Sequence, residues 1–203
     1  MQIRDNYAIQ TAQAKLRFLT YDQQELIRRC RLRYDEAYLY TRLLGSRYRI
    51  CRRTGDMEYL SEGKWVDGNS FAEVMVLLDW LCDSREDRYI TGNWVNLVNQ
   101  NHAFHQDLQA GEDEDARAFS QTPEKLAAAC RALGGLPCPG GDLSYTVELV
   151  DGLCIRLLLW HGDEEFPARL RFLWDENTTR YIRYETTWYA LGLLLRKLRA
   201  YMK

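Results

Sequence analysis

Hydrophobic positions repeat with a helical period along much of this chain. Apolar residues three or four apart predict helices over about 6–19, 22–30, 70–82, 101–109, 122–133 and 185–202. The segment 70–82 is apolar on nearly every side, which predicts a buried central helix. In the first helix, the stripe expected to face the core consists of Ile9, Ala12, Leu16 and Leu19.

Two other regions alternate between apolar and polar residues, as strands do. The first, from Tyr34 to Leu60, contains turn signals at Gly45 and Gly55 and predicts a three-stranded antiparallel meander. The second predicts three strands over about 145–150, 153–160 and 168–174. Strands grouped in this way indicate an α+β fold with antiparallel sheets, packed with the central helix and a C-terminal helix.

The pair Asp151-Gly152 is a strong signal for a two-residue hairpin turn. A regular hairpin around this turn places Val147 opposite Arg156 and Glu148 opposite Ile155. Neither face of the resulting sheet is purely apolar, so we expect partial cover on both faces.

The charge is unevenly distributed, although the net charge of the 203-residue chain is only −2. Residues 1–53 hold twelve Lys and Arg against five Asp and Glu, whereas residues 54–203 hold fifteen against twenty-four. The two parts could attract each other within one fold or meet separate partners. The length fits a single domain over 1–203, and a hydrophobic content of 46% excludes a disordered chain.

Six cysteines stand at positions 30, 51, 82, 130, 138 and 154, with no CxxC spacing. This pattern favours reduced thiols in the cytoplasm over a disulfide framework or a cysteine zinc site. The N-terminus lacks the apolar run of a signal peptide, and no segment approaches the ~18 apolar residues of a membrane span. We therefore expect a soluble, cytoplasmic protein that does not use a membrane.

Three adjacent carboxylates, Asp163, Glu164 and Glu165, follow His161 in the turn between the last two strands. An acidic turn between stiff strands suits a cation or a positively charged partner. Two converging carboxylates would suit a divalent metal ion such as Mg²⁺ or Ca²⁺, and one with a raised pKa would suit acid–base catalysis. Alternatively, Asp163 accepts turn amides, Glu164 faces solvent and Glu165 pairs with Arg169.

A second candidate is the pair His102 and His105, which would share one face of a helix. A metal ion needs further ligands, and a site made by His105 with Asp163 and Glu165 would support a metal-assisted hydrolase or lyase. The other interpretation places these histidines on a helix surface or at a helix cap. No nucleophile elbow, P-loop, GxGxxG or HExxH motif is present, so the sequence leaves open whether the chain is an enzyme.

A third candidate is the stretch from Arg28 to Arg53, which holds nine arginines. Tyrosines lie between them, and Arg with Tyr on a sheet face could bind RNA or phosphate. The alternative is an outer sheet face whose arginines pair with acidic residues of the chain. A pI near 6.0 counts against nucleic acid as the main partner. Within the stretch, Cys51 could have a lowered thiol pKa.

Several short strings together resemble an uncharacterised prokaryotic family, the domain of unknown function 3786. The most specific string is GDEEFP at 162–167, and others are TGNW at 91–94 and RFLWD at 171–175. The resemblance spans most of the chain and implies no established activity. Family members joined to a cysteine-rich iron–sulfur segment imply anaerobic redox or corrinoid metabolism, but this chain has no clustered cysteines.

The leading hypothesis is a non-enzymatic or accessory module that binds a small molecule, a metal ion or a protein partner near the acidic turn. Its candidate ligand-binding residues are Trp160, His161, Asp163, Glu164, Glu165, Asp175 and Trp94.

Overall fold

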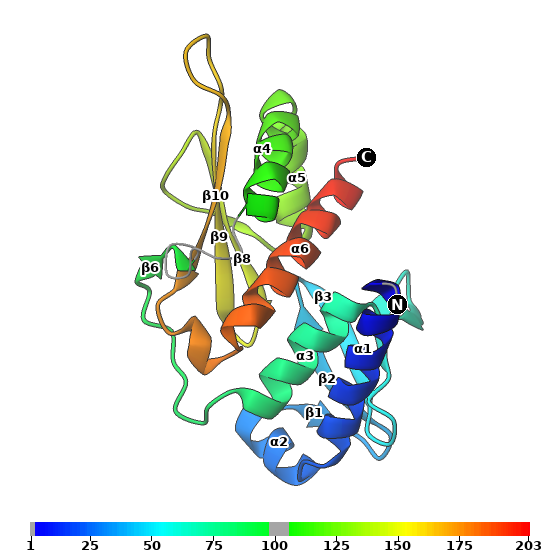
Figure 1. The fold of residues 1–203 in the computed structure, drawn as a ribbon. Helices are drawn as coiled ribbons and strands as arrows, with labels where there is room; N and C mark the ends of the chain where they lie inside the picture. Colours follow the sequence, from blue (N-terminus) through cyan, green and yellow to red (C-terminus); the bar gives the residue numbers. More distant parts are fainter. Residues whose placement is uncertain (1–2, 98–105) are drawn as a thin grey trace. The chain divides into compact units, whose positions relative to one another are not determined.

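The structure is a computed structural model that describes residues 3–97 and 106–203. It divides into two compact units, one of residues 1–89 with 177–195 and one of residues 90–176 with 196–203. Within the described residues, each unit contains helices and a five-stranded antiparallel sheet (Figure 1). The α+β class is therefore confirmed. The expectation of one domain over 1–203 is not tested by this division and stays a prediction.

The sheet of the first unit is a meander in which each strand pairs with the next along the chain. Its strands are β1 (Arg33–Tyr34), β2 (Tyr38–Leu43), β3 (Ser46–Cys51), β4 (Met57–Ser61) and β5 (Lys64–Asp67). The antiparallel meander is confirmed, but it has two more strands than the three expected. The additional strands β1 and β5 are edge strands of two and four residues, too short for an alternating pattern to be visible.

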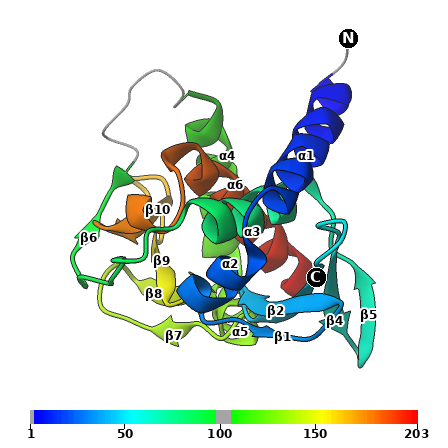
Figure 2. The ribbon, with the colours of Figure 1, turned by 90° about the horizontal axis from the view of Figure 1, so that it is seen from below.

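The central helix α3 (Phe71–Asp83) is buried along most of its length, as its all-round apolar sequence predicts. It runs beside α1 (Ile3–Leu19), as Figures 1 and 2 show. The hydroxyl of Tyr48 on β3 donates a hydrogen bond to the buried Glu73 of α3 at 2.5 Å. The short helix α2 (Gln23–Cys30) begins after Asp22, whose carboxylate accepts a hydrogen bond from the helix.

The first helix buries a different face from the one expected. Ile9, Leu16 and Leu19 are exposed, with Leu16 at 65%, whereas Phe18 is completely buried. Lys15 also faces the rest of the unit, where its Nζ donates hydrogen bonds of 2.7 Å to Asp56 and Asn69. The expected stripe was wrong because polar side chains with partners occupy inward positions that the hydrophobic pattern assigns to solvent.

The sheet of the second unit has the strand order β6-β10-β9-β8-β7. Its strands are β6 (Trp94–Val95), β7 (Leu136–Pro137), β8 (Leu143–Val150), β9 (Leu153–Trp160) and β10 (Arg169–Asp175). The three strands expected from the sequence form its centre. The two-residue strands β6 and β7 form the edges, and each makes two residue pairs with its neighbouring strand.

The hairpin between β8 and β9 turns at Asp151-Gly152, where both residues have positive φ, but its register differs from the expected one. Val147 lies opposite Ile155 and Glu148 opposite Cys154, because a bulge follows Glu148. A bulge places two residues of one strand against one of the other. One face therefore becomes continuously apolar, whereas the regular hairpin mixed Val147 with Arg156.

Two helices cover the apolar face of this sheet (Figure 1). They are α4 (Gln106–Gln121), which packs on β9 and β10, and α5 (Pro123–Ala132), which packs on β8. The acidic run 112–115 lies within α4. Asp115 is only 3% exposed, and its carboxylate pairs with Arg199.

The C-terminal helix α6 (Tyr184–Tyr201) confirms the last expected helix, and its residues are divided between the two units. It follows the short 3₁₀ helix η3 (Thr178–Arg180). In the part of the chain that the structure describes, no helix combines the length and the apolar character needed to cross a bilayer.

Candidate functional site

The acidic turn between β9 and β10 is closed by hydrogen bonds between the side chain of Asp163 and backbone N–H groups of the turn. Oδ1 of Asp163 accepts hydrogen bonds from the N–H groups of Phe166 at 2.7 Å and Glu165 at 2.9 Å. These two amides lower the pKa of Asp163 below its usual range. A Cβ at Gly162 would lie 2.7 Å from the backbone nitrogen of Ala168, so the turn has no space for a side chain there.

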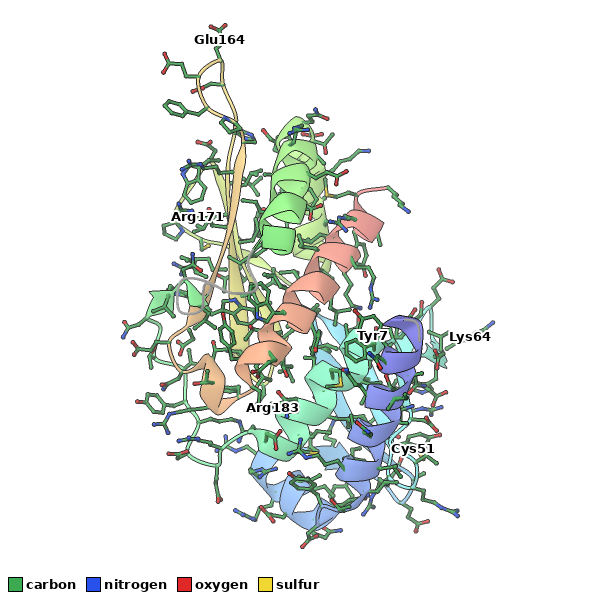
Figure 3. The ribbon with its side chains drawn as sticks, in the orientation of Figure 1. Tyr7, Cys51, Lys64, Glu164, Arg171 and Arg183 are labelled. Carbon is green, nitrogen blue, oxygen red and sulfur yellow. The ribbon has the colours of Figure 1, made fainter. Side chains whose placement is uncertain are left out.

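Glu164, Glu165 and Phe166 form the end of this turn, and we call these three residues the acidic tip. Figure 3 shows Glu164 at the far end of the loop, beyond the ends of β9 and β10. All three residues are exposed, and the Phe166 side chain is 63% exposed. No ion pair with a described residue involves either glutamate, so the expected pair of Glu165 with Arg169 is not formed.

His161 and Trp160 lie where β9 runs into the turn. The N–H of His161 donates to Oδ2 of Asp142 at 2.7 Å, and its Nδ1 lies 3.0 Å from the hydroxyl oxygen of Ser120 on α4. The ring of Trp160 lies 5.9 Å from the guanidinium carbon of Arg171. These contacts attach the base of the turn to its own unit, which is a positioning role.

Asp175 and Trp94 lie at the opposite end of β10 from the acidic tip. Asp175 is 1% exposed and accepts hydrogen bonds from the N–H and hydroxyl of Thr91 and from the N–H of Gly92, at 2.8 to 3.0 Å. Trp94 on β6 lies opposite Asp175 on β10 in the strand register, and its ring centroid lies 4.1 Å from the guanidinium carbon of Arg156. Because β10 extends for about 20 Å, one small ligand does not contact both ends.

The metal site expected from the sequence depends on a residue outside the described part of the chain. His105, like His102, falls in the segment 98–105. Among the residues that are described, no three His, Cys, Asp or Glu side chains are grouped to hold a metal ion. Asp163 and Glu165 therefore gain no third described ligand, and a site that includes His105 stays a prediction.

Arginines of the stretch 28–53 have partners within the first unit. Arg49 lies between the rings of Tyr38 and Trp65, with its guanidinium carbon 4.2 and 4.6 Å from their centroids, and pairs with Glu58 at 2.7 Å. Arg28 pairs with the exposed Glu86. These contacts favour the interpretation of a sheet face with internal ion pairs, and RNA or phosphate binding through this stretch stays a prediction.

The thiol of Cys51 is unusual among the cysteines of the chain. Partial burial would raise its pKa, but hydrogen bonds from the side chain of Thr54 and from the backbone of Arg53 and Thr54 outweigh burial and lower it. The lowered value agrees with the sequence hypothesis, although hydrogen bonds rather than arginine charges are the cause. Burial instead raises the pKa of Cys82 and Cys130 to about 12.

The sequence did not predict a cluster of two acids and two arginines in the first unit. Asp79 and Asp83 lie one helical turn apart on α3; Arg183 (labelled in Figure 3) pairs with both, and Arg17 pairs with Asp83. Burial and a hydrogen bond with Asp83 raise the pKa of Asp79. The only signal in the sequence was the presence of two acids four residues apart in the second half of a largely apolar helix. The side chain of Asp79 is completely buried, and its ion pair with Arg183 ties α3 to the start of α6 within the first unit.

The second unit also contains a groove of about 550 Å³ between α4, the start of α5 and the end of α6. Its lining includes Phe119, Met202 and the ion pair between Arg199 and Asp115. Both guanidinium nitrogens that contact Asp115 are already hydrogen-bonded to its two carboxylate oxygens. The lining of the groove thus combines apolar side chains with a charged pair whose two charges offset each other.

Comparison with known proteins identifies a family without an assigned activity. The family model described as domain of unknown function (DUF3786) matches residues 22–197. No curated protein and no solved structure matches the chain. The match covers most of the chain and includes the acidic turn and both strands that carry it, so the chain belongs to the DUF3786 family.

Proposed function

We propose that this member of the DUF3786 family is a non-catalytic binding module whose acidic tip docks on a positively charged surface of a protein partner. The observation that carries the proposal is the tip itself: Glu164 and Glu165 without ion-pair partners among the described residues, next to the exposed ring of Phe166. Aromatic rings are enriched at protein contact surfaces, and unpaired charges guide a partner of opposite charge to such a surface.

The three side chains of the tip would contribute in different ways. Unpaired carboxylates at an exposed position attract a basic surface and raise the rate of association. Burial of a phenylalanine side chain contributes about 2 kcal/mol, so Phe166 would mainly slow dissociation. The hydrogen bonds of Asp163 fix the turn before binding, which reduces the ordering cost.

A protein partner fits this site better than a metal ion or a small molecule. Pockets for small molecules are concave and cover most of their ligand, whereas Glu164 stands at the end of a protruding loop (Figure 3). A metal ion prefers several converging oxygen ligands, and Oδ1 of Asp163 already accepts two backbone hydrogen bonds.

Site-specific photocrosslinking in cells that naturally contain the protein tests this proposal. A photoreactive phenylalanine analogue replaces Phe166, and the matched control carries the same analogue at Leu136, which is 70% exposed on the edge strand β7. We expect a discrete crosslinked protein from position 166 that is absent from position 136. Identical products from both positions, or no product from position 166, would refute docking by the tip.

We also propose that the protein works in the cytoplasm. All six cysteines are free, and Cys30, Cys82 and Cys130 are buried. Free thiols persist in a reducing compartment, whereas oxidising compartments favour disulfides. Fractionation of cells, followed by detection of the protein in the membrane-free cytoplasmic fraction, tests this assignment, and recovery outside that fraction would contradict it.

A further inference from the structure

The outer face of the second unit's sheet carries a row of positive charge. Side chains alternate along each strand, and α4 and α5 cover the face that presents Val147, Leu157 and Phe172. The opposite face presents Arg156 from β9 and Arg171 from β10. Figure 3 shows Arg171 on the side of these strands that is turned away from α4.

Arg156 lies half-buried beneath Trp94, with its guanidinium carbon 4.1 Å from the ring centroid. Its Nε is buried and has no hydrogen-bond partner among the residues that the structure describes. A buried donor without a partner is destabilising and calls for an explanation. The guanidinium group of Arg156 also carries its terminal N–H donors, which lie in one plane with Nε, and paired N–H groups of this kind bind two oxygens of an oxyanion.

The carboxylates on this face have hydrogen-bond partners other than its arginines. Glu148 accepts a hydrogen bond from the N–H of Gly152 at 2.9 Å, and Asp175 holds the hydrogen bonds from residues 91–92 described above. In the described part of the chain, neither Arg156 nor Arg171 forms an ion pair. Because arginine stays protonated at all physiological pH values, both groups carry a positive charge that no ion pair among the described residues offsets.

The register of β9 and β10 brings the two arginines together. Arg156 lies opposite Leu173, and Arg171 is two residues away along β10, so the arginines are diagonal neighbours with Cβ atoms about 7–8 Å apart. The ring of Trp160 lies 5.9 Å from the guanidinium carbon of Arg171. The result is a strip in the order Trp94, Arg156, Arg171 and Trp160, which we call the Arg–Trp strip.

We propose that the Arg–Trp strip binds the phosphate group of a small phosphate monoester. A phosphate monoester carries a charge of about −1.5 to −2 at neutral pH, which matches two unpaired guanidinium groups better than a single carboxylate does. Arg156 would donate in its plane, and Arg171 would supply the second charge. Either of the partly exposed rings, Trp94 beside Arg156 or Trp160 beside Arg171, offers stacking surface to an organic group attached to the phosphate. This site is separate from the acidic tip and from the arginines of residues 28–53.

Isothermal titration calorimetry on the full chain tests the proposal with three probes: inorganic phosphate, ribose 5-phosphate and adenosine 5′-monophosphate. Equal affinities assign the site to the free anion, and stepwise tighter binding assigns it to a sugar phosphate or a nucleotide. Arg171→Gln removes an exposed charge, whereas Arg156→Met removes the unpartnered donor and keeps most of the side-chain volume. The matched control is Arg117→Gln, which makes the same charge change on an exposed position of α4 in the same unit.

We expect at least one probe to bind, with an affinity that falls as salt is added. Because a hydrogen bond to a charged group changes affinity ten- to hundredfold, Arg171→Gln should weaken binding by about tenfold and Arg156→Met by more, while Arg117→Gln leaves it unchanged. Arg156→Met should also retain the melting temperature, since a ligand-binding arginine is dispensable for folding. Absence of binding for all three probes at millimolar concentration, or affinities that both strip variants leave unchanged, would overturn the proposal.

Discussion

The buried carboxylate of Asp175 should matter more for stability than any acidic residue of the turn. It accepts hydrogen bonds from two N–H groups and one hydroxyl of residues 91–92, which join the segment before β6 to the end of β10. Each hydrogen bond to a charged acceptor contributes about 1.5–3 kcal/mol, but the donors regain water when the segment opens. We therefore expect Asp175→Ala to lower the free energy of unfolding by about 3 kcal/mol.

Thermal and urea unfolding of the purified variants measure this loss. For a chain of this length, about 3 kcal/mol corresponds to a fall in melting temperature of about 6–12 °C. Asp175→Asn keeps the shape of the side chain and one acceptor oxygen, so its free energy of unfolding should fall by less than that of Asp175→Ala. Glu164→Gln is the control, because an exposed substitution without partners changes stability by less than about 0.5 kcal/mol. An Asp175→Ala variant as stable as Glu164→Gln would refute the structural role of this carboxylate.

Iodoacetamide is expected to alkylate Cys51 before Cys82. Hydrogen bonds outweigh the partial burial of Cys51 and lower its pKa, whereas burial raises the pKa of Cys82 to about 12. Peptide mass mapping over time gives the order of alkylation, and equal rates would contradict the prediction. Leu16→Ser should change the free energy of unfolding by less than about 0.5 kcal/mol, whereas Phe18→Ser should lower it by at least about 3 kcal/mol; similar losses in urea unfolding would disprove the observed orientation of α1. Asp79 has a raised folded pKa, so wild-type stability should fall as pH rises from about 3.9 through that pKa. Asp79→Asn cannot ionise, so its free energy of unfolding should rise relative to that of the wild type as pH increases across this range. A difference between the two proteins that stays constant with pH would argue against the raised pKa.

Long elements with a consistent pattern could be predicted from the sequence alone. The helix α3 is apolar on nearly every side, and the Asp151-Gly152 turn needs the positive φ values that it adopts. The register of that hairpin could not be predicted, because a bulge shifts the pairing by one residue without a sequence signal. The buried face of α1 was misassigned for a related reason: Lys15 points inward with two hydrogen-bond partners.

The candidate sites could likewise be predicted where their contacts are local in the sequence, and not where they join distant residues. The acidic turn is a contiguous string, so its position could be predicted, and the hydrogen bonds of Asp163 are local to it. The buried role of Asp175 depends on residues 91–92, more than eighty positions away. The contact between Arg156 and Trp94 depends on the order of strands in the sheet. The spacing of residues along the chain does not reveal contacts of this kind.

The most direct test of the central claim combines the crosslinking probe at position 166 with charge reversal of its neighbours. Glu164→Lys with Glu165→Lys leaves the hydrogen bonds of Asp163 to the turn amides in place, because they involve only backbone groups of residue 165 and its neighbour. If the acidic tip docks on a basic surface, charge reversal should abolish the crosslinked product, and added salt should reduce the product of the wild-type tip. Equal yields from the wild-type and charge-reversed tips would contradict the account.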